Sequence, residues 1–177
     1  MLHQDGLVDD IVREYLSEDI PEGVYDLRDW KYFSGSGELR IGKVEIFSEG
    51  ESNGTVINAK KTFLKIEVLN PHHFTGHFEL AGRIKTIDGD YVGYFGSRLA
   101  NKQYGIKANQ NSVIVEVEFA NFPLVERQYG LGFELKFNGI VVYTDDISLK
   151  FDVVDHDFFS CGWIDNNGFM LLPQNWK

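Results

Sequence analysis

Two neighbouring segments of this sequence carry charged, aromatic and small side chains that could bind a polar ligand together. Residues 77–86 and 91–98 both alternate between apolar and polar types, and Asp88-Gly89 between them is a typical two-residue turn. This pattern predicts a β-hairpin in which Ile87 faces Asp90. The other predicted pairs are Thr86 with Tyr91 on the core side, and Lys85 with Val92, Arg83 with Tyr94, Ala81 with Gly96 and Glu79 with Arg98 on the outer face.

A third segment adds to the same outer face. In an immunoglobulin-like strand order, residues 129–137 lie beside the hairpin, and their outward residues are then Gly130, Gly132, Glu134 and Lys136. Glycine within a strand permits close approach of a ligand or of another backbone. We therefore expect a shallow depression with small residues at its floor and charged residues and a tyrosine at its rim.

Sugars suit such a face, because their hydroxyl groups form several hydrogen bonds and their C–H faces lie against aromatic rings. We interpret the face as a carbohydrate-binding surface with Glu79, Arg83, Tyr94 and Arg98 at its centre. The alternative interpretation is an ordinary solvated sheet face, on which cross-strand ion pairs are common and weak.

Two carboxylates on this face raise the question of glycoside hydrolysis. Glu79 and Glu134 could lie within the roughly 5 to 10 Å that two catalytic carboxyl groups require. Hydrolases also keep one carboxyl protonated in an apolar cleft, whereas the predicted face is open and charged. The histidines of NPHHFTGH (70–77) fit a loop and a strand end better than the converging ligands of a zinc ion. We therefore expect no catalytic residue, no metal site and no cofactor.

The elements that must position these residues are β-strands. From Leu39 onward, short runs rich in Val, Ile and Phe alternate with period two and are separated by Gly, Asn and Asp. They predict an all-β fold, an antiparallel immunoglobulin-like or jelly-roll β-sandwich of seven to eight strands. The predicted strands are residues 40–47, 62–69, 77–86, 91–98, 112–119, 129–137, 147–154 and 168–172.

The chain divides into a leader, residues 1–34, and a sandwich domain, residues 35–177. In LVDDIVREYLSED the apolar residues recur at helical spacing, which predicts a short helix over residues 7–17. Proline and glycine then interrupt the chain repeatedly before the first long strand.

The charge of the chain argues against polyanionic partners. The 17 Lys and Arg residues against 27 Asp and Glu give a formal net charge of −10, so we expect neither nucleic acid nor an anionic membrane as partner. No apolar run approaches the roughly 18 residues of a membrane helix. With a single cysteine, Cys161, and no signal-peptide pattern, the sequence predicts a soluble cytoplasmic chain with a buried thiol.

The C-terminal stretch GFMLLPQNWK (168–177) is unusually apolar for a chain end. It predicts a closing strand that covers either its own sandwich or that of a second copy. Exchange of a terminal strand is a low-cost route to a homodimer. The residues expected to take part are Phe169, Leu171, Leu172 and Trp176.

Four stretches, in order along the chain, resemble one family: the C-terminal domain of the ATP-binding subunit of O-antigen polysaccharide ABC transporters, the Wzt type. GSGELRIGKVEIF (35–47) is similar to the Gly-x-Gly-Glu opening of that domain, and DGDYVGYFGSR (88–98) to its central hairpin. FPLVERQYGLGFEL (122–135) resembles its apolar-proline stretch followed by Tyr-x-Leu, although Arg127-Gln128 replaces the usual glycine. GFMLLPQNW (168–176) resembles its closing strand and tryptophan.

The resemblance implies a β-sandwich that binds the non-reducing end of a finished O-polysaccharide and marks it for export. It also implies a separate ATPase domain, with residues 1–34 as part of the tether, a membrane transporter subunit as partner, and a location at the cytoplasmic side of the inner membrane. No G-x-x-x-x-G-K-[ST] loop occurs, and GESNGT (50–55) lacks the lysine, so we do not expect this chain to hydrolyse ATP.

Family members differ in their polysaccharide, so the site residues above depend on the predicted strand pairing and not on the family. The competing hypothesis is a structural module of the transporter that only dimerises and leaves the charged face unused.

Overall fold

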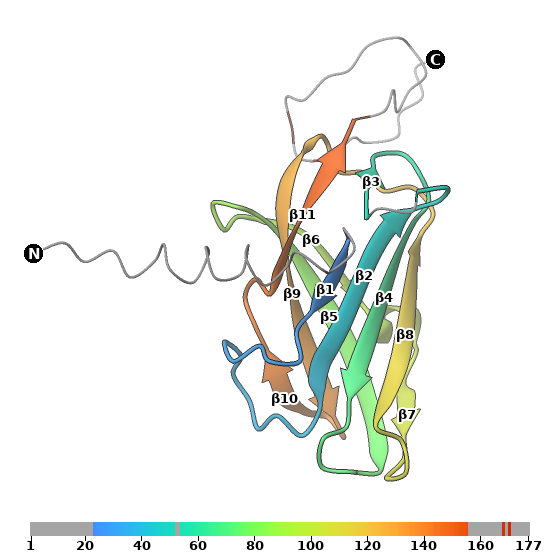
Figure 1. Cartoon of the computed structure of the whole chain (residues 1–177), viewed down its shortest axis with the longest axis vertical. Helices are drawn as coiled ribbons and strands as arrows, with labels where there is room; N and C mark the ends of the chain where they lie inside the picture. Colours follow the sequence, from blue (N-terminus) through green and yellow to red (C-terminus); the bar gives the residue numbers. More distant parts are fainter. Residues whose placement is uncertain (1–22, 52–53, 156–167, 169, 171–177) are drawn as a thin grey trace, which may run out of the picture.

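The computed structural model describes residues 23–51, 54–155, 168 and 170, and this part of the chain folds into two packed β-sheets (Figure 1). It contains eleven strands and one four-residue 3-10 helix, η1. The elements are β1 (Val24–Asp26), β2 (Arg40–Ser48), β3 (Val56–Ile57), β4 (Thr62–Leu69), β5 (Gly76–Thr86), β6 (Tyr91–Gly96), η1 (Ser97–Ala100), β7 (Tyr104–Ile106), β8 (Ser112–Phe119), β9 (Arg127–Phe137), β10 (Ile140–Thr144) and β11 (Leu149–Val154).

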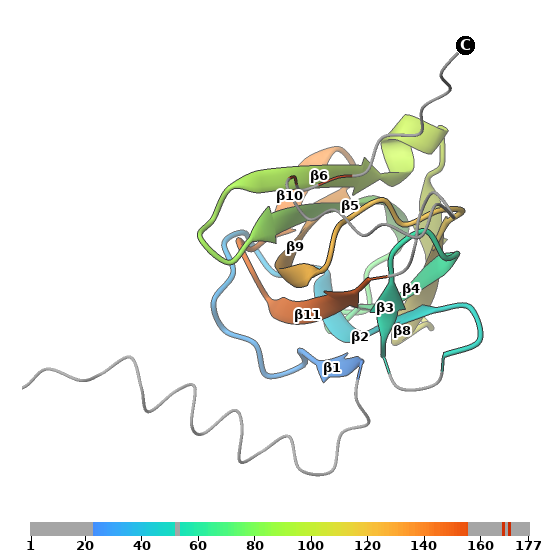
Figure 2. The same cartoon turned by 90° about the horizontal axis from the view of Figure 1, so that it is seen from above.

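The described strands form a four-stranded sheet in the order β1-β2-β4-β8 and a seven-stranded sheet in the order β3-β11-β9-β5-β6. In the second sheet β10 also pairs with β9, and β7 also pairs with β5. Viewed from above, β5, β6 and β9 lie in one layer and β2, β4 and β8 in the other (Figure 2). The pairings described are antiparallel except that of β3 with β11, which is parallel. The all-β sandwich predicted from the sequence is confirmed.

The core lies between the two sheets, where alternate residues of each long strand point inward. In β4 the burial pattern alternates without interruption, and in β9 every second residue from Tyr129 to Phe137 is buried. Burying a Leu, Ile or Phe side chain contributes roughly 1.5 to 3 kcal/mol, so burial of the apolar side chains determines which face of each strand points into the core. A one-residue slip would expose the entire apolar set of a strand.

The long strands lie where the alternation predicts them, and β4 and β8 match to the residue. The described strands β1, β3, β7 and β10 were not predicted, so the expected count of seven to eight is too low. Three of these four have only two or three residues, which is too short for period-two alternation to be recognised.

Residues 23–37 pack against the sandwich, although the sequence places most of them in the leader. Strand β1 pairs with β2, and Ser34 forms an antiparallel bridge with Thr144. The hydroxyl of Tyr25 donates a hydrogen bond of 2.6 Å to the backbone oxygen of Lys150, which ties the edge of one sheet to β11 of the other. Burial, and then the charge of Asp152, raises the pKa of Tyr25 to about 12, so this donor keeps its proton at neutral pH.

Several sequence predictions fall on residues outside the described ranges. They are the helix at 7–17, the buried thiol of Cys161, and the strand-exchange residues Phe169, Leu171, Leu172 and Trp176. Of the predicted strand at 168–172, Gly168 and Met170 are described, and Met170 forms an antiparallel bridge with Leu124.

Candidate functional site

The central hairpin has the predicted register over most of its length. Arg83 lies opposite Tyr94, and Ala81 lies opposite Gly96. The predicted pairs nearest the turn are wrong, because a bulge between Ile84 and Lys85 places Lys85 opposite Tyr91.

The cause of the bulge lies in the turn itself. The backbone N–H of Thr86 donates to the oxygen of Asp90 at 2.9 Å, and the Thr86 hydroxyl accepts from the Asp90 N–H at 3.1 Å. These bonds join Thr86 to Asp90, which is one residue earlier in the sequence than its predicted partner, Tyr91. Val92 is left as the extra residue, as in an ordinary β-bulge.

Arg98 does not lie in a strand, so its predicted ladder pairing with Glu79 does not form. Strand β6 ends at Gly96, and the chain enters η1, where the Ser97 hydroxyl accepts a hydrogen bond of 3.1 Å from the Leu80 N–H. Beyond this point β7 takes over the pairing with β5, at Gly76 to Phe78. Arg98 and Glu79 nevertheless lie in the lining of one surface depression.

Strand β9 lies beside β5, as predicted, and completes this depression. Glu134 lies opposite Ala81, and Lys136 lies opposite Glu79. Glu134 is within 3.7 Å of the Arg83 guanidinium and 3.6 Å of the Lys136 ammonium group. The cavity volume is about 30 Å³, and the lining residues are Glu79, Leu80, Ala81, Tyr94, Gly96, Arg98, Glu134 and Lys136. The structure thus brings seven of the ten predicted site residues together in a shallow hollow.

Gly130 and Gly132 do not contribute to the depression, which corrects the expectation that they make room for a ligand. Both are buried, and a Cβ at Gly132 would lie 2.1 Å from the backbone oxygen of Asp146. A Cβ at Gly130 would lie 2.7 Å from the side chain of Ile147. The glycines therefore permit close approach of the chain's own segment 145–147, which is the other reason for glycine in a strand.

The same segment closes the turn end of the outer face. The Lys85 ammonium group is buried and forms an ion pair with Asp146, and it also lies 4.4 Å from the centre of the Tyr91 ring. The hydrogen bond that Lys85 donates to the Asp146 carboxylate is the main cause that raises the pKa of Lys85. The open part of the face consequently runs from Arg83 to Arg98.

Arg83 is the one predicted site residue still to be placed, and it lies between the depression and a larger hollow. Its Nη2 atom donates to the Thr144 hydroxyl at 2.5 Å and lies 3.5 Å from the backbone oxygen of Phe133. The larger hollow has a volume of about 490 Å³, and its lining residues are Tyr32, Phe33, Ser34, Arg83, Thr144, Asp145 and Asp146.

Sequence reasoning missed this larger hollow. Its wall on one side is β10, which follows a tight turn at Asn138-Gly139 where both residues have positive φ. Asn-Gly is a strong hairpin signal and could have revealed β10. The other wall, residues 32–34, has no recognisable period, because the pairing of Ser34 with the distant Thr144 holds it in place.

Asp145 is a buried carboxylate at the edge of this hollow. Its Oδ1 atom accepts a hydrogen bond of 2.7 Å from the Phe133 N–H, and its Oδ2 atom accepts one of 2.5 Å from the Tyr143 hydroxyl. Burial raises the pKa of Asp145, although these hydrogen bonds and the Arg83 charge act in the opposite direction. Burial and the neighbouring carboxylate also raise the pKa of Tyr143.

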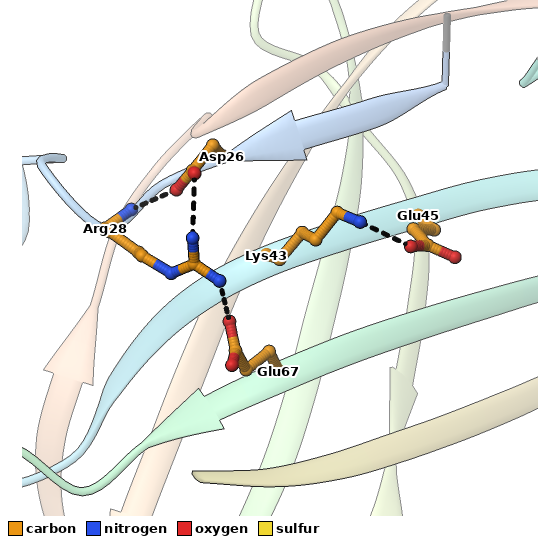
Figure 3. Close-up of polar contacts among 5 residues, drawn as sticks. All are labelled: Asp26, Arg28, Lys43, Glu45 and Glu67. Carbon is orange, nitrogen blue, oxygen red and sulfur yellow. Dashed lines mark hydrogen bonds and ion pairs between the residues drawn. The ribbon is translucent and has the colours of Figure 1, made fainter. Parts of the chain in front are cut away.

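The outer face of the four-stranded sheet differs from that of the seven-stranded sheet. Figure 3 shows Arg28 between two carboxylates, at 3.1 Å from Asp26 and 3.0 Å from Glu67, and Lys43 at 2.9 Å from Glu45. The charges lie on or beside β1, β2 and β4 and pair with one another both along and across the strands. This is the arrangement expected of an ordinary solvated sheet face.

Among the described residues, no group of three or more His, Cys, Asp or Glu side chains is arranged to hold a metal ion. In the same part of the chain no helix is long and apolar enough to cross a membrane.

The stretch GELRIGKV (37–44) has the glycine and lysine spacing of a phosphate-binding loop, but Val44 replaces the Ser or Thr. It runs into β2, where Val44 is fully buried in the core, whereas a phosphate-binding loop leads into a helix. The stretch is therefore not such a loop.

Comparison with known proteins gives the fold. The chain matches no protein-family model and no characterised protein sequence. The crystal structure of the C-terminal domain of Wzt is similar with a TM-score of 0.69 at 17% identity, and the match covers 88% of this chain and 91% of that domain. Two β-glucuronidases, one from glycoside hydrolase family 2 and one from Bacteroides uniformis, give TM-scores of 0.40 and 0.42 at 17% and 16% identity. Each match covers 62% of this chain, but only 10% and 12% of those enzymes. The chain has the fold of the Wzt C-terminal domain, as the resemblance in its sequence predicts.

Proposed function

We propose that this chain is a non-catalytic carbohydrate-binding domain that recognises the non-reducing end of an O-antigen polysaccharide and couples it to ABC-transporter export. The observation that carries the proposal is the depression on the seven-stranded sheet, which groups Glu79, Tyr94, Arg98, Glu134 and Lys136 on a fold shared with the Wzt C-terminal domain. The membrane transporter subunit and a separate ATPase domain are its proposed partners, at the cytoplasmic side of the inner membrane.

The side chains of the depression match the chemistry of a sugar. Tyr94 is 60% exposed, and its ring can lie against the C–H face of a pyranose. Arg98 and Lys136 supply hydrogen-bond donors, and Glu79 supplies acceptors for sugar hydroxyl groups. Because Arg83 and Lys136 lie on either side of Glu134, its carboxylate oxygens are held in fixed positions on the face.

The size of the depression favours contact with one sugar unit. Its 30 Å³ exceeds the roughly 10 to 15 Å³ that a cavity needs to hold one water molecule, so a hydroxyl or another small substituent enters it while the ring rests on the surface. Ala81 and Gly96 form the floor, where longer side chains would fill this space. A shallow contact of this kind suits recognition of a chain end better than enclosure of a substrate in a catalytic cleft.

The proposal includes a homodimer formed by exchange of the C-terminal strand. The supporting observation is the antiparallel bridge of Met170 to Leu124, which lies in the connection between β8 and β9. Met170 itself is 41% exposed. A strand that pairs with this connection could belong to either copy, since exchange preserves the same contacts.

The test compares two tyrosines of β6. Isothermal titration with the O-polysaccharide is expected to show about tenfold weaker binding for Tyr94→Ala, because a stacking contact is lost. Tyr91→Ala is the matched control, since Tyr91 is 67% exposed on the same strand but lines neither hollow. Equal binding by both variants, with circular dichroism showing intact folds, would move the site away from the depression.

A further inference from the structure

The larger hollow lies next to the proposed sugar-binding depression, with Arg83 between them. The Arg83 guanidinium is part of the lining of the hollow, and its ion-pair partner Glu134 is part of the lining of the depression. At about 490 Å³ the hollow falls in the range of ordinary ligand pockets, roughly 300 to 1,000 Å³, whereas the depression does not. A ligand that rests on the depression could therefore extend past Arg83 into a hollow large enough to hold a further part of that ligand.

The wall formed by residues 32–34 is held in place by several contacts. Ser34 and Thr144 exchange two backbone hydrogen bonds of 2.8 Å, and the Phe33 ring stacks on Tyr143 with 4.8 Å between centroids. At Gly35, φ is +118°, and a Cβ would lie 2.4 Å from the backbone oxygen of Val142. Only glycine permits this close approach, so the hollow exists before any ligand binds.

The exposed groups of the hollow suit a sugar ring. Tyr32 is 69% exposed and presents an aromatic face, with its ring in edge contact with Trp30 at 5.0 Å. Ser34 and Asp146 are exposed at the rim, and both carry oxygens that bind hydroxyl groups. An aromatic platform with polar groups around it is the arrangement that the depression also has.

The charges of the hollow select against an anionic ligand. Its lining contains one cation, Arg83, which already lies 3.7 Å from Glu134 and donates to Thr144. The lining also contains two acidic residues, Asp145 and Asp146, of which Asp146 is balanced by Lys85. No cation in this lining is in excess, so a carboxylate or phosphate on the ligand would meet repulsion without compensation.

We propose that this hollow is a second sugar subsite, which binds a neutral pyranose unit next to the one on the depression. The inference rests on the proposed function and extends it. The domain binds at least two consecutive sugar units, and Arg83 lies between them. Tyr32 provides the ring contact in the second subsite, and Ser34 contributes a hydroxyl.

The test measures how affinity depends on ligand length. The full chain is titrated with a monosaccharide and a trisaccharide from the non-reducing end of a neutral O-polysaccharide. The wild type is expected to bind the trisaccharide at least tenfold more tightly. In Tyr32→Ala this ratio is expected to fall toward one, because the second ring contact is lost. In Tyr91→Ala, the matched control, the ratio stays at the wild-type value.

Amide chemical shifts locate the contact independently of affinity. The signals of Ser34 and Thr144 are expected to move with the trisaccharide and not with the monosaccharide. If Tyr32→Ala keeps the wild-type ratio of trisaccharide to monosaccharide affinity and the Ser34 and Thr144 signals do not move, the second subsite is wrong while the proposed function stands. If the wild type binds no fragment, the proposed function fails and the inference fails with it. Tighter binding of a uronic-acid trisaccharide, with loss of that preference in Tyr32→Ala, would contradict the neutral ligand class.

Discussion

At the scale of single residues, Arg83 organises the outer face. It reaches from β5 to the Thr144 hydroxyl on β10 and to Glu134 on β9, so one planar group connects three strands. Its side chain is only 22% exposed, which leaves it little freedom to adopt other positions. A guanidinium can serve several acceptors at fixed angles, whereas an ammonium group acts as a point charge.

Replacing Arg83 by Lys tests this geometry. We expect Arg83→Lys to keep the fold but to weaken binding of the O-polysaccharide by about tenfold, because the charge remains and the fork of donors is lost. The measurement is isothermal titration at equal ionic strength. Lys43→Arg, on the outer face of the four-stranded sheet and in the lining of neither hollow, is the control for a change of cation and is expected to bind within about twofold of the wild type. Full affinity of Arg83→Lys would show that charge alone is needed.

Asp145 gives a second residue-scale prediction, concerning pH. Because burial raises its pKa in the folded state, the folded protein holds a proton that the unfolded chain releases above about pH 4. The wild type therefore loses stability from this group as pH rises from about 4 through the raised folded pKa. Asp145→Asn cannot ionise, so its stability relative to the wild type should increase over this window.

Urea denaturation of wild type and Asp145→Asn at several pH values measures the unfolding free energy of each protein. The value for Asp145→Asn minus the value for the wild type is expected to increase as pH rises. Other carboxylates act equally in both proteins and cancel in that difference. A difference that is constant with pH, or that falls as pH rises, would show that the buried carboxyl has no raised pKa.

At the scale of elements, the outward glycines of the seven-stranded sheet have two different roles. Gly132 allows segment 145–147 to cross over β9, whereas Gly96 on β6 leaves open space at the floor of the depression. A Cβ at Gly132 would meet backbone at 2.1 Å, but a Cβ at Gly96 would first meet the Tyr94 hydroxyl at 3.2 Å. Backbone cannot give way as easily as an exposed side chain.

Alanine substitution separates these roles. We expect Gly132→Ala to lower the unfolding free energy by roughly 1 to 3 kcal/mol, as overpacking does. Gly96→Ala should change stability by less than about 0.5 kcal/mol but weaken sugar binding, because the methyl group fills the floor. Urea denaturation and isothermal titration of both variants check this. A stable Gly132→Ala protein, or a Gly96→Ala protein with full affinity, would contradict the assignment.

The same glycines show how far the sequence alone predicts the site. Period-two alternation is a local signal, so it located β5, β6 and β9 and, through the Asp88-Gly89 turn, paired Arg83 with Tyr94. It could not show that Asp146 covers Gly132, because that contact depends on where the chain goes after β10. The larger hollow was missed for the same reason.

At the scale of the whole molecule, the fold agrees with the Wzt C-terminal domain along 88% of the chain at only 17% identity. Agreement at so low an identity gives the fold and leaves the ligand open. The proposed ligand therefore depends on the residues of the outer face, and the exchange of the C-terminal strand stays a prediction.

Deletion of residues 165–177 tests that prediction. Because the segment carries many apolar side chains and Met170 pairs with Leu124, we expect the shortened chain to aggregate or to change its oligomeric state. Light scattering coupled to size-exclusion chromatography measures this, with a chain lacking only Lys177 as control. A stable species with the oligomeric state of the intact chain would show that the segment is dispensable.

The most direct test of the central claim is titration of the full chain with the O-polysaccharide of its own organism, native and with the terminal non-reducing residue removed. If the depression recognises a chain end, the native polymer binds and the trimmed polymer binds at least tenfold more weakly, which corresponds to about 1.4 kcal/mol. Equal binding of both polymers, or binding of neither, would contradict end recognition by this domain.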